Sequence, residues 1–180
     1  MQVPAIGLEF RLNLTSSSVN GMLDNFSFSL FSNLAYIELS INKFFGVIPP
    51  LICFLSKLIY LDLSTNQFSG NIPPEIGLLT NLETLHLFNN QLNGSIPQEI
   101  DQLKSLIELV LYNNSLSGPI PTSLTNLRNL TRLYLYGNDL SGSIPPEMGN
   151  LVNLAEVYMN GNNLTGPIPF TLGNLNNLTM

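Results

Sequence analysis

NLETLHLFNNQLNGSIPQEIDQLK, residues Asn81–Lys104, is one copy of a unit that repeats along most of this chain. One asparagine of the unit returns every 24 residues, at Asn42, Asn66, Asn90, Asn114, Asn138 and Asn162. An Ile-Pro pair keeps the same step from Ile48-Pro49 to Ile168-Pro169. Self-similarity at such a period predicts a solenoid, in which each coil buries its apolar face against its neighbours.

Each unit opens with leucines spaced as in a half-buried strand, for example Leu82, Leu85 and Leu87. The recurring asparagine follows three residues later. Its amide both donates and accepts, so we expect stacked asparagines to bond the turn backbone of neighbouring coils. A glycine then allows a turn, and the proline of Ile-Pro removes a backbone donor from the return segment. The pattern predicts an α/β solenoid whose coil is a strand, a turn and a short 3₁₀ or irregular return arm.

Both ends of the repeat array depart from this unit. Residues 1–32 are interpreted as a degenerate first repeat with a remnant of an N-terminal cap, in which Ser17 replaces the ladder asparagine. Residues 33–176 form six regular repeats, and residues 177–180 begin a further, truncated one. If no further repeat packs on the last strand, apolar core residues and an unpaired sheet edge are exposed to solvent. We therefore expect this chain to be a fragment of a longer array.

Composition excludes several functional classes. The net charge is −6 and the six Lys and Arg residues are scattered, which disfavours nucleic acid and anionic membranes as partners. Cys53 is the only cysteine and His86 the only histidine, and they lie in different repeats. No spacing suggests a metal site, a cofactor or a catalytic group, so we expect no enzyme activity. No apolar run approaches the length of a membrane span, and the first ten residues lack the features of a signal peptide.

The repeated pattern LxxLxLxxNxLxGxIPxxLGxL resembles the plant-specific class of leucine-rich repeat found in receptor-like kinases and receptor-like proteins. The opening segment Arg11–Ser40 is similar to the first repeats of subfamily XII receptor kinases. The resemblance implies a right-handed superhelix with a parallel sheet on its concave face, together with secretion and N-glycans. It also implies a parent at the extracellular face of the plasma membrane, with a membrane span and a Ser/Thr kinase domain. This chain lacks the family's paired cap cysteines, so any kinase activity belongs to that longer parent.

Recognition is the function that the pattern favours. Repeat positions four, six, eight and nine should face away from the core, including the small residues Ser40, Ser64 and Val110. All six tyrosines occupy such positions. Tyrosine suits strands in general, but none stands at a core position, which favours a binding surface. The predicted ligand-binding residues are Tyr60, His86, Phe88, Tyr112, Arg132, Tyr134, Tyr136 and Tyr158.

The expected partner is a peptide or protein ligand, together with a co-receptor ectodomain. A concave sheet about 30 Å long matches an extended peptide of about nine residues. Arg132 is positioned for a ligand carboxylate or carbonyl, whereas the acidic residues of this face favour basic ligand groups. These acidic residues are Glu38, Asp62, Glu108 and Glu156.

Seven Asn-x-Ser/Thr sequences are predicted glycosylation acceptors, and their number agrees with secretion. They are Asn13, Asn25, Asn93, Asn113, Asn129, Asn163 and Asn177. Two alternatives to a receptor kinase fragment stay open. One is a kinase-less recognition protein, either a receptor-like protein or a wall-enzyme inhibitor, and the other is a truncated gene product without function.

Overall fold

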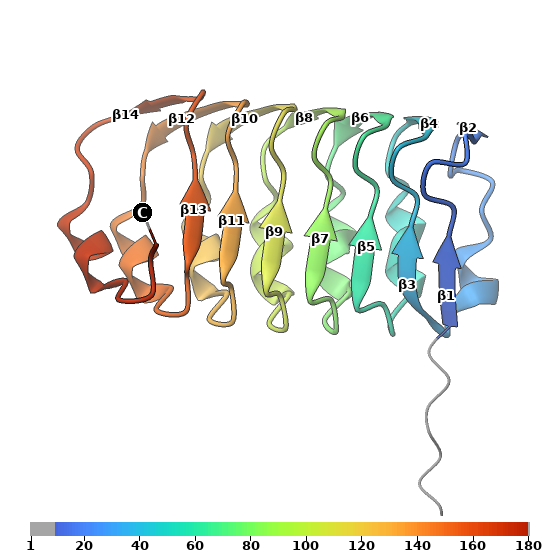
Figure 1. Ribbon diagram of the computed structural model, residues 1–180, viewed down its shortest axis with the longest axis horizontal. Helices are drawn as coiled ribbons and strands as arrows, with labels where there is room; N and C mark the ends of the chain where they lie inside the picture. The colour runs from blue at the N-terminus through green and yellow to red at the C-terminus, as the bar shows by residue number, and fades with distance from the viewer. Residues whose placement is uncertain (1–9, 180) are drawn as a thin grey trace, which may run out of the picture.

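The computed structural model describes residues 10–179, which form a solenoid of stacked coils (Figure 1). Each coil contributes one strand to a first sheet, a short second strand to another sheet, and a 3₁₀ helix. The two sheets run side by side along the whole stack, and the 3₁₀ helices return each coil to the next strand. The solenoid predicted from the 24-residue period is therefore confirmed.

The first sheet is the concave sheet, and all its strands are parallel neighbours in chain order. The strands are β1 (Phe10–Asn13), β3 (Leu34–Glu38), β5 (Tyr60–Asp62), β7 (Thr84–His86), β9 (Glu108–Val110), β11 (Arg132–Tyr134) and β13 (Glu156–Tyr158). Paired residues lie one repeat apart, as Leu61 and Leu85 do. Between β1 and β3 the offset grows by one residue, so that Leu12 pairs with Ile37. The longer first repeat is thus absorbed without breaking the sheet.

The second sheet was not predicted from the sequence. Its strands are β2 (Asn20–Gly21), β4 (Lys43–Gly46), β6 (Gln67–Asn71), β8 (Gln91–Gly94), β10 (Ser115–Pro119), β12 (Asp139–Ser143) and β14 (Asn163–Thr165). These segments are rich in Gly, Ser and Asn, which are not favoured in strands. Hydrogen bonds between successive coils, rather than local propensity, give them their extended form. Gly70 sits in this row with φ +75°, a backbone conformation that glycine adopts without strain.

The return arms are seven 3₁₀ helices, as the Ile-Pro motif indicates. They are η1 (Phe28–Phe31), η2 (Pro50–Phe54), η3 (Pro74–Leu78), η4 (Gln98–Gln102), η5 (Thr122–Asn126), η6 (Pro146–Asn150) and η7 (Phe170–Asn174). In η3 the Ile76 N–H donates to the Pro73 carbonyl at 3.0 Å, and the Leu79 N–H donates to the Ile76 carbonyl at 3.1 Å. Proline pre-sets φ at the residue from which η2 to η7 start, whereas η1 follows Ser27.

The core is a column of aliphatic side chains between the two sheets and the 3₁₀ helices. Leu85, Leu87, Leu92 and Ile100 of one coil are completely buried, and their counterparts in neighbouring coils stack on them. Burial of apolar area at about 25 cal/mol per Å² is the dominant stabilising term for such a column.

The recurring asparagines form a hydrogen-bonded ladder between coils. The Asn90 Oδ1 accepts the Phe68 N–H at 3.0 Å. Its Nδ2 donates to the Leu63 carbonyl at 3.0 Å and to the Leu87 carbonyl at 3.1 Å. Asn42, Asn66, Asn114, Asn138 and Asn162 repeat this arrangement. The amide therefore satisfies backbone groups that neither sheet reaches.

The last coil is more exposed than those before it. Ile168 is 79% exposed and Phe170 is 92% exposed, and β13 and β14 form the edges of the two sheets. Within residues 10–179 no helix is long and apolar enough to cross a bilayer.

Candidate ligand-binding surface

The outward side chains of the concave sheet form three rows along the stack, because paired strands keep one register. The row at the start of the strands carries Tyr60, Glu108, Arg132 and Glu156. The middle row carries Asp62, His86, Tyr134 and Tyr158. Phe88, Tyr112 and Tyr136 form the third row, just beyond the strand ends. All eight predicted ligand-binding residues thus lie on one surface.

The third row is a continuous aromatic ridge, made of Phe88, Tyr112 and Tyr136 with Tyr158 beside its end. The Phe88 and Tyr112 rings stack with centroids 4.5 Å apart and an angle of 14°. Those of Tyr112 and Tyr136 stack at 4.4 Å and 8°. Tyr158 meets Tyr136 edge to face at 6.5 Å and is 49% exposed. Because stacked rings cover one another's faces, the ridge presents ring edges and hydroxyl groups to a ligand.

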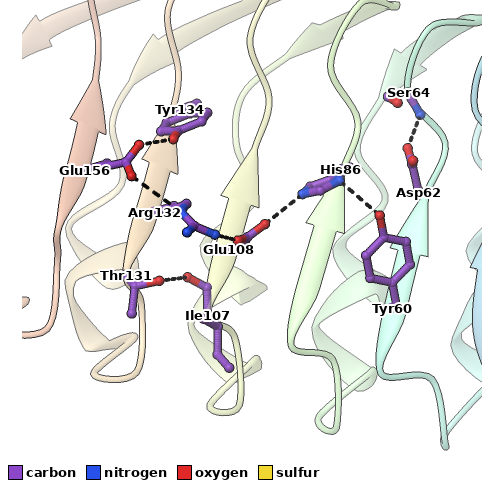
Figure 2. Close-up of polar contacts among 10 residues, drawn as sticks. All are labelled: Tyr60, Asp62, Ser64, His86, Ile107, Glu108, Thr131, Arg132, Tyr134 and Glu156. Carbon is purple, nitrogen blue, oxygen red and sulfur yellow. Dashed lines mark hydrogen bonds and ion pairs between the residues drawn. The ribbon is translucent and has the colours of Figure 1, made fainter.

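A chain of polar contacts crosses the first two rows from β5 to β13 (Figure 2). The Tyr60 hydroxyl lies 3.5 Å from His86 Nδ1, and His86 Nε2 lies 3.1 Å from the Glu108 carboxylate. Arg132 bonds to Glu108 through Nη1 and lies 3.6 Å from Glu156 through Nε. The Tyr134 hydroxyl donates to Glu156. These contacts hold the side chains of five successive strands in one arrangement.

Burial and charge set the protonation states along this chain. Burial lowers the pKa of His86, and the charge of Asp62 only partly opposes this, so the imidazole is neutral at pH 7. A neutral ring fits the contacts if Nε2–H donates to Glu108 and Nδ1 accepts from Tyr60. Burial also raises the pKa of Tyr60. Burial together with the hydrogen bond to Glu156 raises the pKa of Tyr134 to about 12.

The structure changes the expected role of Arg132. Sequence reasoning left its guanidinium available for a ligand carboxylate or carbonyl. In the structure Glu108 and Glu156 flank it on both sides, although 48% of the side chain is exposed. A ligand carboxylate would have to displace one of them, so Arg132 serves first to order its two neighbours.

Three residues expected on the open surface are buried instead. Ser64 is 2% exposed, Val110 5% and Ser40 6%. All three are small side chains. The sequence pattern identifies the direction in which each side chain points, but not how far adjacent side chains bury it.

The predicted glycosylation acceptors are all exposed but fall into two groups. Asn25, Asn93 and Asn163 make no side-chain hydrogen bond within the described residues. The other four are engaged. Asn13 donates to Glu38 at 3.0 Å and Asn113 to Asn89 at 2.9 Å.

Asn129 and Asn177 belong to a second ladder that sequence reasoning missed. Each side chain donates to a backbone carbonyl of the preceding coil. The contacts are Asn81 to Ser56, Ser105 to Thr80, Asn129 to Lys104, Asn153 to Arg128 and Asn177 to Val152. The 24-residue spacing of these polar residues was the available signal.

Across residues 10–179 no group of three or more His, Cys, Asp or Glu side chains is placed to hold a metal ion. Cys53 is a free, half-buried thiol on η2, away from the concave sheet. The arrangement offers hydrogen-bonding, charged and aromatic groups in fixed positions.

Comparison with known proteins agrees with the repeat pattern. A family model described as a leucine-rich repeat region matches residues 12–179. The Arabidopsis thaliana protein MDIS1-interacting receptor like kinase 2 is 53% identical over 47 residues, which are 26% of this chain and 4% of that protein.

Two solved plant receptors superpose on nearly the whole chain. The peptide hormone receptor RGFR1, in complex with RGF2, has a TM-score of 0.87 and 41% identity, covering 95% of this chain and 27% of its own. The Arabidopsis receptor kinase HAESA, in complex with the peptide hormone IDA and the co-receptor SERK1, has a TM-score of 0.86 and 40% identity. That match covers 89% of this chain and 27% of the HAESA chain. The chain therefore spans about a quarter of each solved receptor chain.

Proposed function

Because the chain belongs to the leucine-rich-repeat family, we propose that it is a non-catalytic recognition module that binds an extended peptide across its concave sheet. The observation that carries the proposal is the aromatic ridge, which continues over four successive coils. Tyrosine supplies large contact area at low cost in side-chain entropy, and it is enriched at binding hot spots.

The polar chain beneath the ridge supports the same proposal. Tyr60, His86, Arg132 and Tyr134 are held by one another and by two glutamates before any ligand arrives. Side chains ordered in advance lose less entropy on binding, which favours affinity. Seven strands spaced about 4.8 Å apart give a surface of about 30 Å, the length of about nine extended residues.

We further propose that the parent protein is a plant receptor-like Ser/Thr kinase with this module at the extracellular face of the plasma membrane. The support is the similarity to receptor kinases, two of which were solved with peptide hormones and one also with a co-receptor. A co-receptor ectodomain is then a second partner. Sequencing the full-length transcript tests this, since the frame should continue into a membrane span and a kinase; a frame without them would contradict it.

N-glycans are part of this proposal, with Asn25, Asn93 and Asn163 as the favoured acceptors. Their amides make no contact that a glycan would disturb, and Asn93 and Asn163 lie on the second sheet, away from the concave surface. Mass spectrometry of the chain secreted from plant cells would show which acceptors are occupied.

The binding proposal is tested by selecting peptides from a random nonapeptide display library with the chain. Tyr112→Ala and Tyr136→Ala should each raise the Kd of a selected peptide about ten-fold, as expected for hot-spot aromatics. Gln98→Ala, an exposed change on η4 at the far side of the coil, is the matched control and should leave the Kd unchanged. Equal Kd values for the wild type and both tyrosine variants would contradict the proposal.

A further inference from the structure

The first two strands of the concave sheet show how this surface holds a cation. The Arg11 guanidinium lies 4.4 Å from the centroid of the Tyr36 ring. Its Nε is 3.5 Å from the Glu38 carboxylate. The tyrosine contributes a cation–π contact and the glutamate contributes charge, so this tyrosine–carboxylate pair is a site for a guanidinium.

The next coil repeats that pair in register. Tyr36 pairs with Tyr60 and Glu38 pairs with Asp62 across β3 and β5. The residue at the position of Arg11 relative to this second pair is Tyr36, which is not a cation. The second pair thus has a carboxylate with no positive group supplied by the preceding strand, beside a ring on which Tyr36 stacks with centroids 6.4 Å apart.

Asp62 is the carboxylate of the concave sheet that has no cationic partner among residues 10–179. Arg11 pairs with Glu38, and Arg132 pairs with Glu108 and Glu156. Asp62 accepts one hydrogen bond, from the Ser64 N–H at 2.9 Å (Figure 2). His86 on the neighbouring strand bonds to Tyr60 and Glu108 instead, and its neutral ring leaves the charge of Asp62 uncompensated.

Asp62 itself is partly exposed. The third-row residues beside it, Ser40 and Ser64, are small and buried, and the aromatic ridge begins only at Phe88, one coil further on. Burial raises the pKa of Tyr60 and of Tyr112, and the charge of Asp62 adds a smaller contribution in the same direction.

We infer that the Tyr60–Asp62 pair is a subsite for a cationic side chain, arginine or lysine, of the bound peptide. This inference rests on the proposed function and adds the chemistry of its ligand and the place of the ligand's basic residue. The basic residue lies over β5, and an adjoining segment of the peptide lies along the aromatic ridge from β7 to β13. Four strand steps separate β5 from β13, about 19 Å, so about five or six residues separate the basic residue from the one over Tyr158.

The experiment compares N-acetylated synthetic peptides chosen from the nonapeptide library by the wild-type chain. Selected peptides should share an Arg or Lys, and replacing it with neutral citrulline or glutamine should raise the wild-type Kd about ten-fold. With Asp62→Asn the same replacement should change the Kd less than about two-fold. Asparagine keeps an oxygen for the Ser64 N–H, and an unchanged urea midpoint verifies that the variant folds.

Glu38→Gln is the matched control, since Arg11 already pairs with that carboxylate. It should leave the ten-fold effect of the basic residue intact. Three results would overturn the inference: selected peptides without a shared basic residue, an equal effect in wild type and Asp62→Asn, or no effect of the basic residue in the N-acetylated peptides. Peptides that depend on Tyr112 but not on Asp62 overturn the inference and leave the proposed function standing, whereas failure to select any peptide overturns both.

Discussion

At the scale of single residues, the ladder asparagines carry the contacts that leucine packing cannot make. Asn90 joins the backbone of two successive coils through one amide. Without it the Phe68 N–H would be left inside the solenoid without a partner, which costs about 1–3 kcal/mol. The Asn90 side chain therefore contributes to the free energy of unfolding through its hydrogen bonds as well as through packing.

Asn90→Ala should lower the free energy of unfolding by about 1–3 kcal/mol, because it leaves the buried Phe68 N–H without its acceptor. The Leu63 and Leu87 carbonyls each lose one bond but keep another, from Asn66 and Asn114 respectively. Urea titration followed by circular dichroism measures the change. Asn93→Ala is the control, since this exposed side chain makes no hydrogen bond within the described residues, and its effect should stay within about 0.5 kcal/mol. Equal urea midpoints for the two variants would show that the Asn90 side chain does not stabilise the folded chain.

At the scale of elements, the close approach of successive 3₁₀ helices explains a recurring glycine. A Cβ on Gly149 would lie 2.3 Å from the Thr171 carbonyl oxygen of the next coil, and a Cβ on Gly77 would lie 2.4 Å from that of Glu99. Neither glycine has positive φ, so the close approach of the next helix at these two places, and not backbone strain, disfavours a side chain there. Cys53, Asp101 and Thr125 hold the same repeat position in other coils.

Gly149→Ala should therefore destabilise the chain by about 1–3 kcal/mol, since η6 and η7 must move apart. Gly173→Ala is a matched control at the same position of η7, where nothing lies within 4 Å of the added carbon. It should be neutral or slightly stabilising. Thermal unfolding of both variants decides the point, and a loss of stability shared equally by both would contradict the steric explanation.

At the scale of the whole molecule, stability is shared between neighbouring coils and declines toward the last one. Leu116 is fully buried in the interior of the stack, whereas Leu164, at the same repeat position two coils later, is only partly buried. A solenoid coil that has one neighbour instead of two opens more readily.

Leu116→Ala should accordingly cost about 2–5 kcal/mol, while Leu164→Ala should cost clearly less, because fewer contacts are lost at the end of the stack. Native-state hydrogen exchange should also show faster exchange in β14 than in β10. Equal losses in the two variants, with uniform exchange along the stack, would indicate a single cooperative unit instead.

The sequence by itself determined the architecture of the coil and which residues lie in the core or on the concave surface. The 24-residue period, the leucine alternation and Ile-Pro are local patterns, and they suffice to place the core, the 3₁₀ arms and the direction of every tyrosine. Those features depend on backbone geometry within one repeat, which residue type and spacing encode directly.

Only the tertiary structure decided what each side chain meets in the neighbouring coil. The second sheet, the pairing of Arg132 with two glutamates and the second ladder through Asn129 all join residues about one repeat apart. Their formation depends on register and side-chain conformation across a strand spacing of about 5 Å, which no pattern within a single repeat specifies.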